Sequence, residues 1–404
     1  SGACIVLLLL IFYLYLYTYR RKLLDNLRHV FFFVILMAII TSGAFLVLQY
    51  APVGYIYLIP FAWCPVIARV FYDSRTAIFV HIITVFIVSI AVPAPYVFLF
   101  MQVLTGIVAV ISLRDMTQRA QLAKTAAFIL LAYSLLYTAV TVLTTGSITD
   151  LDYRLYFYFA INAVLVICSY GLIFLFERTF GLLSNITLVE LTNVNSNLML
   201  EFAEKAPGTF QHSLQVSNLA TEAAKRIGAK VLLVRTGALY HDIGKMTHPE
   251  YFIENQSGSN PLSNMSYEQA ASVIIDHVEE GERIARKHRL PEVIVHFIRS
   301  HHGTSVTRYF YNSAVNAAKA AGQSAEDIRK EDYTYPGPKP STKEAAILMM
   351  ADAIEARSRS LDELTEQSIA SMVDQMIDSQ VADGQFAETA LSFKDSSKCP
   401  FPHK

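Results

Sequence analysis

The sequence predicts an all-α protein in which a polytopic domain of seven transmembrane helices precedes an all-helical domain in water. Charged residues make up 17% of the 404-residue chain, well below the roughly 25% that is typical of soluble domains. Apolar and aromatic residues dominate up to about Phe176, whereas Glu, Lys, His and Asp become common beyond about Ser184. In that second part apolar residues recur at helical spacing, and no segment alternates as a strand would. We therefore expect one domain solvated by lipid and one solvated by water.

Seven apolar segments are candidates for membrane helices, since a helix needs about 20 mostly apolar residues to cross a bilayer. Two pairs of segments are tightly joined, around Ala51 and around residues 93–95, where proline forces a turn. The first segment is short, and we interpret it as truncated. The segments cover approximately residues 3–18, 30–50, 52–72, 76–92, 96–113, 125–144 and 155–176.

The basic residues between these segments predict their orientation. They follow the first, third, fifth and seventh segments, whereas the other connections hold almost none, with Arg154 as the exception. By the positive-inside rule the basic loops are cytoplasmic, so the chain begins outside and its C-terminal half lies inside. The basic residues are Arg20, Arg21, Lys22, Arg28, Arg75, Arg114, Arg119, Lys124 and Arg178.

Two ionisable residues fall within the apolar segments, and each allows two interpretations. In the first interpretation Arg69 and His81 line a ligand cavity, because ionisable groups within a membrane are often functional. The alternative, which we favour, is that Arg69 extends to the cytoplasmic interface and His81 is hydrogen-bonded between helices.

The chain divides into four expected parts. Residues 1–178 form the seven-span domain, residues 179–205 a helical connector, residues 206–390 the soluble domain and residues 391–404 a loose tail. The chain begins within an apolar run and without methionine, so we interpret it as a fragment of a longer polypeptide. A net charge of −1 and the lack of a long Lys/Arg tract argue against binding to a nucleic-acid polymer. The four cysteines suggest no disulfide framework.

Histidines gather in the soluble half, where eight of the eleven lie between residues 212 and 302. A lone histidine is more often a surface or hydrogen-bonded residue than a metal ligand. The pairs His241-Asp242 and His301-His302 each stand shortly before a glycine, and polar pairs at such places are costly to bury unless a partner such as a metal is present. Imidazoles with carboxylates suit iron, manganese, cobalt or zinc better than calcium or magnesium. The candidate ligands are His212, His241, Asp242, His277, His301, His302 and Asp352.

The order of these residues resembles the H…HD…D signature of HD-domain phosphohydrolases, which His212, His241-Asp242 and Asp352 would carry. His277 and His301-His302 resemble the additional ligands of the two-metal subgroup of that family. A longer resemblance, to the seven-transmembrane receptor HD family of membrane cyclic-di-AMP phosphodiesterases, covers essentially the whole chain, because that family also has seven spans directly before its HD domain. The matching motifs occupy residues 206–213, 240–245, 254–256, 301–304, 309–311 and 335–338.

This resemblance implies two divalent transition-metal ions, with iron or manganese preferred. His212, His241, Asp242 and Asp352 would hold one ion, and Asp242, as a bridge, would hold the second together with His277, His301 and His302. The sequence departs from the family pattern at Leu262, where the family often has a histidine. It also lacks, after His302, the Gly-Tyr-Pro element of the cyclic-di-GMP enzymes, which argues against cyclic di-GMP as the substrate.

The expected reaction is hydrolysis of cyclic di-AMP to linear pApA at a membrane. Two metals about 3.5–4 Å apart can acidify a bridging water to hydroxide and bind the phosphoryl oxygens. We expect Asp242 and Lys245 to be the catalytic residues, because Lys245 lies one helical turn beyond Asp242 and can reach a phosphate oxygen. The alternative for Lys245 is a surface lysine near a helix end. The reaction type follows from the metal ligands, whereas the nucleotide follows only from the resemblance.

Two further features have alternative interpretations. Glu355 lies three residues after Asp352, on the same helix face, and is either a hydrogen-bond partner of a metal-bound histidine or a solvated glutamate. The proline-rich residues 333–340 either form a wall of the substrate pocket, with Tyr335 or Lys339 at the ligand, or simply connect two helices.

Two rival functions stay open. The chain could be a phosphatase for another phosphorylated ligand, or a receptor and transducer whose HD domain binds without hydrolysis. Degenerate domains of the latter kind lose metal ligands, and the presence of all seven here favours an enzyme. The resemblance places the chain in the plasma membrane of a bacterium, as a multi-pass protein with a cytoplasmic HD domain. It also implies an extracellular sensor domain upstream of this fragment; a homodimer is an open alternative.

Overall fold

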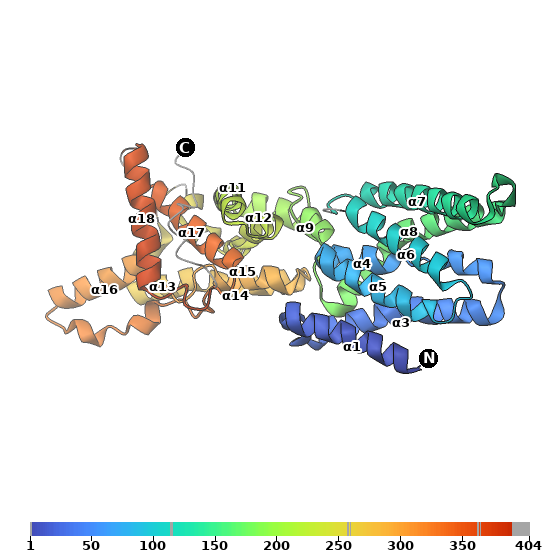
Figure 1. Cartoon of the computed structure of the whole chain (residues 1–404). Coiled ribbons are helices and arrows are strands. Elements are labelled where there is room, and N and C mark those ends of the chain that lie inside the picture. Colours follow the sequence, from blue (N-terminus) through green and yellow to red (C-terminus); the bar gives the residue numbers. More distant parts are fainter. Residues whose placement is uncertain are drawn as a thin grey trace. The chain divides into compact units, whose positions relative to one another are not determined.

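The computed structural model describes residues 2–113, 116–256, 258, 260–361, 363 and 365–389. The chain divides into two compact units, Ser1–Thr187 and Leu188–Lys404, which Figure 1 shows in sequence colours. Regular structure in the described residues is helical, apart from one isolated antiparallel bridge between Val306 and Thr334. The predicted all-α class is therefore confirmed. Arg114 and the predicted tail, 391–404, lie outside the described residues.

The N-terminal unit is a bundle of apolar helices. Six of its helical segments are long and apolar enough to cross a membrane by length and composition, and a seventh apolar helix, α5, is shorter. Each of the seven predicted segments therefore contains a helix. The main helices are α1 (Gly2–Tyr19), α3 (Leu27–Tyr50), α4 (Trp63–Phe71), α5 (Ser74–Ser89), α6 (Pro95–Ser112), α7 (Ala120–Thr145) and α8 (Tyr153–Phe180).

The third predicted segment, 52–72, is interrupted. A 3₁₀ helix covers Val53–Leu58, and α4 begins only at Trp63. Pro60 lies in the break, and a proline has no backbone N–H to donate within a continuous helix. The uniform apolar composition of residues 52–72 concealed this division.

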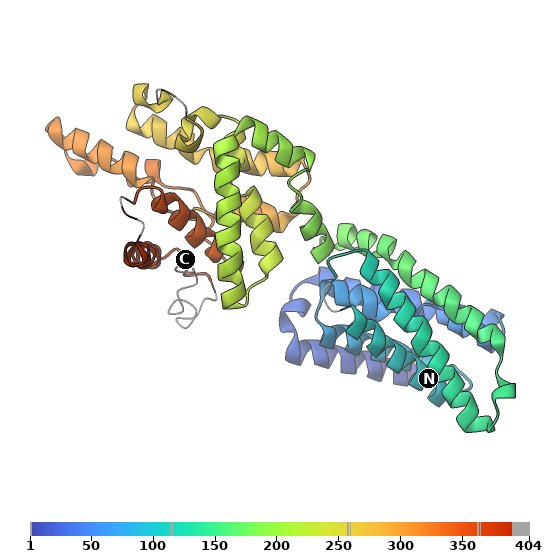
Figure 2. The same ribbon diagram turned by 90° about the horizontal axis from the view of Figure 1, so that it is seen from above.

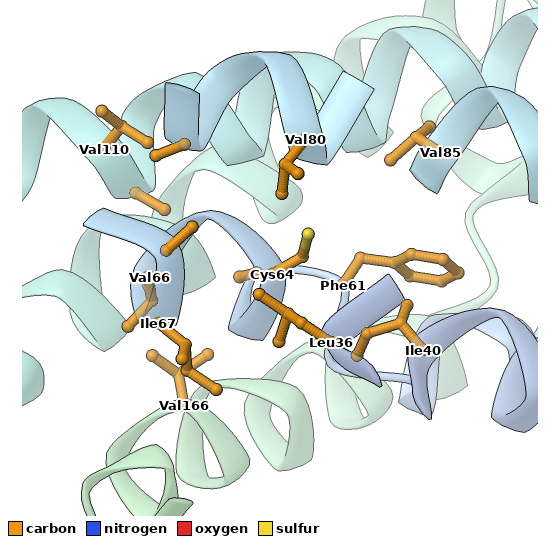
Figure 3. Packing of buried hydrophobic residues seen from close by; sticks show 14 of the residues in the cluster. Leu36, Ile40, Phe61, Cys64, Val66, Ile67, Val80, Val85, Val110 and Val166 are labelled. Atoms are coloured by element: carbon orange, nitrogen blue, oxygen red, sulfur yellow. The ribbon is translucent and has the colours of Figure 1, made fainter. Parts of the chain in front are cut away.

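Apolar side chains fill the centre of the N-terminal unit and also cover much of its surface. Figure 3 shows Leu36, Phe61, Cys64 and Val80 packed together, and all four are buried. Such a surface is expected where hydrocarbon replaces water as the solvent, so the unit is that of a multi-pass membrane protein. Exposed large apolar residues include Val6, Phe31, Leu46, Phe100, Leu143 and Phe174.

His81 joins two membrane helices, which confirms the favoured interpretation of this residue. Its Nε2 atom donates a hydrogen bond to the Gln102 carbonyl of α6 at 2.9 Å, and the Gln102 side chain accepts one from the Tyr133 hydroxyl at 2.6 Å. Gly106 makes room for the imidazole, because a Cβ atom there would lie 2.1 Å from His81 Nε2. The half-buried Arg69 at the end of α4 donates to the Tyr72 carbonyl at 3.2 Å.

The C-terminal unit is also helical. Helix α11 packs against α12 and α17, and α14 packs against α15; Figure 2 shows α11 and α12 side by side in yellow-green. Pro207 starts α11, since its missing N–H is not needed in the first turn, and Gly228, at φ +73°, ends it. Helix α9 (Asn185–Leu191) includes the boundary between the two units. The helices that follow it are α10 (Asn197–Lys205), α11 (Pro207–Ile227), α12 (Val231–Tyr240), α13 (Tyr267–Ile275), α14 (His277–Lys287), α15 (Glu292–Ser300), α16 (Arg308–Ala320), α17 (Lys343–Ser358) and α18 (Glu366–Ala382).

Candidate metal centre

Three helices, and the turns that follow two others, bring all seven predicted ligands into one place. His212 lies within α11, His277 opens α14, and Asp352 lies within α17. The pair His241-Asp242 directly follows α12, and the pair His301-His302 directly follows α15. Six of the seven side chains belong to buried residues, and His302 is partly exposed. Residues up to 140 positions apart therefore share one polar interior.

The seven side chains form two groups that share one carboxylate. Within each group the potential ligand atoms lie within 4.8 Å of one another, and each group can hold a metal ion. Asp242 belongs to both. The first group is His212, His241, Asp242 and Asp352, and the second is Asp242, His277, His301 and His302.

The two oxygens of Asp242 face different groups. Asp242 Oδ2 lies 3.5 Å from His212 Nε2 and 3.3 Å from His241 Nε2. Asp242 Oδ1 lies 3.3 Å from His277 Nε2 and 3.5 Å from His301 Nε2. A carboxylate arranged in this way can bridge two cations, one on each oxygen.

Asp352, from α17, completes the first group. Its Oδ1 atom lies 2.9 Å from His212 Nε2 and 3.4 Å from His241 Nε2. Its Oδ2 atom lies 3.8 Å from His302 Nδ1 of the second group. Helix α17 therefore lies against both groups.

Two fully buried polar atoms in this interior have no hydrogen-bond partner among the described residues. They are His241 Nε2 and Asp242 Oδ1. Burying such atoms without a partner costs several kcal/mol or leads to a change of ionisation. Imidazole nitrogen and carboxylate oxygen are the donors that divalent transition metals prefer. The donor set thus fits cations of this kind.

The charges of the site favour ionised carboxylates. Burial alone would raise the pKa of Asp242, but the positive charges of His241 and Lys245 outweigh it and hold that pKa well below its usual range. Burial likewise opposes the ionisation of Asp352, and the hydrogen bond from His212, together with the neighbouring His241, keeps its pKa well below the usual range. Both carboxylates are therefore anionic at neutral pH.

The imidazoles of the two groups differ in the charges around them. Burial lowers the pKa of His212, but Asp352 and Glu355 more than offset this and bring it to about 9. Burial and the neighbouring His301 hold the pKa of His302 well below its usual value. The first group thus attracts positive charge strongly, and the second offers a neutral imidazole, the form that binds metals.

Glycine allows the elements of the site to approach closely. A Cβ atom on Gly244 would lie 1.9 Å from the carbonyl oxygen of His277. Gly244 lies in the 3₁₀ turn Ile243–Met246, which directly follows His241-Asp242 and contacts α14. Only glycine at this position permits His277 to lie beside Asp242.

Lys245 lies inside the site and contacts two carboxylates. Its Nζ atom is 2.7 Å from Asp242 Oδ2 and 3.1 Å from Glu254 Oε1. Burial would lower the pKa of Lys245, but Asp242 and Glu254 outweigh it and raise that pKa. Thr209 donates a further hydrogen bond to Glu254 at 3.0 Å. The role of Lys245 at a phosphate stays a prediction, whereas the alternative of a surface lysine is wrong.

Glu355 is the hydrogen-bond partner of His212 and is not solvated. Its Oε2 atom accepts from His212 Nδ1 at 2.5 Å, and its Oε1 atom accepts from Arg359 at 2.6 Å. Glu355 is buried. Glu254 lies in one of the matching motifs, but no role was predicted for it or for Arg359; the spacing of Arg359, four residues after Glu355, was the available signal.

A cavity of about 560 Å³ lies beside the site. Its lining includes His302 and Asp352 of the ligand groups and two arginines, Arg308 and Arg357. Residues of α17 and α18 line much of the rest. The volume falls within the range of roughly 300–1,000 Å³ that small-molecule sites occupy.

Two family profiles match the chain in succession. The profile described as a 7TM receptor with intracellular HD hydrolase matches residues 1–184. The HD domain profile matches residues 209–357, which include all seven side chains of the two groups.

Relatives extend the match across both units. The chain is 35% identical to the cyclic-di-AMP phosphodiesterase PgpH of Listeria monocytogenes over 352 residues, which are 84% of this chain and 47% of that protein. It is 31% identical to the cyclic-di-AMP phosphodiesterase PgpH of Bacillus subtilis over 398 residues, 93% of this chain and 54% of that protein. The chain spans about half the length of these curated relatives.

Two solved structures are also similar. The crystal structure of the Listeria monocytogenes PgpH HD domain is 39% identical, covers 51% of this chain and 94% of that chain, and has a TM-score of 0.47. The structure of the same domain in complex with cyclic di-AMP covers 52% of this chain and 95% of that chain, with a TM-score of 0.48. The two profile matches, together with the relatives that extend over both units, show that the chain belongs to the family of 7TM receptors with an intracellular HD hydrolase domain.

Proposed function

We propose that this chain is a metal-dependent membrane phosphodiesterase that hydrolyses cyclic di-AMP to linear pApA. The observation that carries the proposal is the pair of ligand groups sharing Asp242. The names of the relatives from Listeria monocytogenes and Bacillus subtilis support the nucleotide.

The two groups would hold two divalent cations. His212, His241, Asp242 and Asp352 would hold the first, and Asp242, His277, His301 and His302 the second. Bound there, two such ions supply Lewis acidity, which activates water and neutralises the charge that develops on the phosphoryl oxygens. Iron or manganese suits this set of nitrogen and oxygen donors.

The protein's own residues would prepare the site for this chemistry. Asp242 joins the two groups through its two oxygens, and Lys245 restrains that carboxylate by an ion pair at 2.7 Å. Glu355 orients His212 by accepting its Nδ1 hydrogen, so that Nε2 points inward. Such outer partners fix the ring orientation of metal-binding histidines.

The cavity beside His302 and Asp352 would admit the substrate. A cyclic dinucleotide carries a negative charge on each of two phosphodiester groups. Arg308 and Arg357 also line the cavity. We infer that one phosphodiester lies at the ligand groups while these guanidinium groups attract the other, since arginine pairs well with phosphate.

We further propose the orientation that the basic loops predict. The N-terminal end of the chain would lie outside a bacterial plasma membrane, and the HD domain, residues 206–390, in the cytoplasm. Residues 179–205 would connect the two. The positive-inside rule supports this arrangement, and the family description names an intracellular hydrolase.

A substrate panel tests the proposed activity. The full chain, purified in detergent and loaded with Mn²⁺ or Fe²⁺, is offered cyclic di-AMP, cyclic di-GMP and AMP in separate reactions, and the products are separated by chromatography. We expect pApA from cyclic di-AMP and slower turnover of cyclic di-GMP. Release of phosphate from AMP without cleavage of cyclic di-AMP would instead indicate a phosphatase and defeat the proposal.

A further inference from the structure

Four of the five histidines in the two groups are held by a hydrogen bond from Nδ1. His212 Nδ1 pairs with Glu355. The others pair with backbone carbonyls three residues earlier: His241 with Ala238 at 2.7 Å, His277 with Ile274 at 2.6 Å and His301 with Ile298 at 2.7 Å. A carbonyl or carboxylate accepts only from N–H, so Nδ1 carries a hydrogen and Nε2 points toward the interior of the site.

His302 is the exception. Among the residues that the structure describes, its ring makes no hydrogen bond, and its nearest charged neighbour is Asp352 Oδ2, 3.8 Å from Nδ1. The side chain of His302 is 24% exposed, whereas that of His301 is 0% exposed. His302 therefore lies at the edge of the second group without the hydrogen bond that orients the other four rings.

An aromatic contact takes the place of the missing hydrogen bond. The ring of Tyr335 lies against that of His302, with centroids 4.2 Å apart and planes inclined by 31°. His301 also lies close to His302, at 4.0 Å between centroids. Tyr335 is 7% exposed. Two neighbouring rings thus restrict the orientation of His302.

Backbone pairing fixes Tyr335 beside His302. The Tyr335 N–H donates to the Ser305 carbonyl at 2.9 Å, and the Thr307 N–H donates to the Tyr333 carbonyl at 2.8 Å. These two bonds flank the isolated bridge between Val306 and Thr334. Residues 333–335 are therefore paired with residues 305–307, a segment that begins three residues after His302.

We infer that Tyr335 is a positioning residue for His302, and that its ring, rather than its hydroxyl, sets the affinity of the second ligand group for a cation. The inference rests on the proposed function. An imidazole without a hydrogen bond loses more rotational freedom when it binds a cation. The contact with the Tyr335 ring reduces that loss, because the His302 ring is already ordered before a cation binds. Outer partners of metal-binding histidines typically alter metal affinity by about 10- to 100-fold.

Manganese binding to the full chain, measured without substrate, tests this inference. Purified apo protein in detergent is titrated with Mn²⁺. Electron paramagnetic resonance distinguishes free Mn²⁺ from two Mn²⁺ ions that are bound close to each other. For Y335L we expect one Mn²⁺ to bind as in the wild type and the second to bind about tenfold more weakly. Y335F keeps the ring and should match the wild type, and H302A should lose the second ion.

The outcomes separate this inference from the proposed function. If Y335L binds both ions as the wild type does, or if Y335F is impaired as much as Y335L, Tyr335 does not act through its ring. If the wild type itself binds no pair of ions, the metal-dependent function fails instead. If Y335L loses its helical circular dichroism, two other variants replace it in the same titration. Y335M fills the space without a flat ring, and Y335W fills it with one.

Discussion

Lys245 lies between two carboxylates, with its Nζ atom 2.7 Å from Asp242 and 3.1 Å from Glu254. It therefore compensates the negative charge of the carboxylate that both ligand groups share. Its side chain is only 12% exposed, so removal of its charge would leave these two carboxylates without the cation that they share. Lys245 is thus as important for the structure of the site as for any contact with a phosphate.

Replacement of Lys245 by methionine tests this relationship. Removing one partner of a buried ion pair typically costs about 3–5 kcal/mol, so K245M should melt at a clearly lower temperature. The double variant K245M/E254Q, which removes the opposing charge of Glu254, should recover part of the loss. Equal melting temperatures for the single and double variants, measured by circular dichroism, would show that Glu254 is not coupled to Lys245.

Glu355 should control the first ligand group alone. E355Q removes the negative charge of the group that accepts the His212 Nδ1 hydrogen at 2.5 Å. We therefore expect the Mn²⁺ of the first ligand group to bind about tenfold more weakly. R359Q is the matched control, because Arg359 contacts Glu355 but not His212. An E355Q titration that weakens only the second ion would reverse our assignment of the groups.

Gly244 should tolerate no side chain. A Cβ atom there would lie 1.9 Å from the His277 carbonyl, and overpacking typically costs about 1–3 kcal/mol. G244A should therefore be destabilised and should bind the second Mn²⁺ poorly, since His277 must move. G258A, where a Cβ atom meets nothing within 4 Å, provides the control. A G244A protein as stable as G258A would refute the close approach of the two segments.

Removal of metal should both inactivate and destabilise the protein. A chelator should abolish turnover of cyclic di-AMP, and Mn²⁺ or Fe²⁺ should restore it. A ligand at 100 times its Kd stabilises the folded state by about 2.7 kcal/mol, so the melting temperature should rise when Mn²⁺ is returned. Full activity in excess chelator would contradict a metal-dependent reaction.

Arg308 and Arg357 should affect substrate binding more than catalysis. A hydrogen bond to a charged group contributes about 1.5–3 kcal/mol, so R308A and R357A should each raise KM for cyclic di-AMP about tenfold or more. R283A is the control, because Arg283 is an exposed residue of α14 paired with Glu280. Steady-state kinetics in which R308A and R357A match R283A would exclude the cavity as the substrate path.

Much of the site could be predicted from the sequence because its ligands occur in short local motifs. His241-Asp242 and His301-His302 each follow directly on the end of a helix. The Nδ1 bonds of His241 and His301 to carbonyls three residues earlier are local consequences of that helical geometry. Residues that belong to such motifs therefore indicate chemistry without knowledge of the fold.

Long-range contacts could not be predicted in the same way. Tyr335 and His302 lie 33 positions apart in the sequence, and only the pairing of residues 333–335 with residues 305–307 brings their rings together. Composition likewise concealed the break at Pro60, because apolar residues continue on both sides of it. Packing between distant segments decides both features, and a single sequence carries no direct record of that packing.

The metal content of the purified chain tests the central claim most directly. The protein is loaded with Mn²⁺ and free metal is removed. The amount of manganese per chain is then measured by inductively coupled plasma mass spectrometry. We predict two ions per wild-type chain and a clear loss in D242A, because Asp242 contributes an oxygen to each group. A wild-type ratio of zero or one, or an undiminished ratio of two in D242A, would contradict a two-cation site built around this carboxylate.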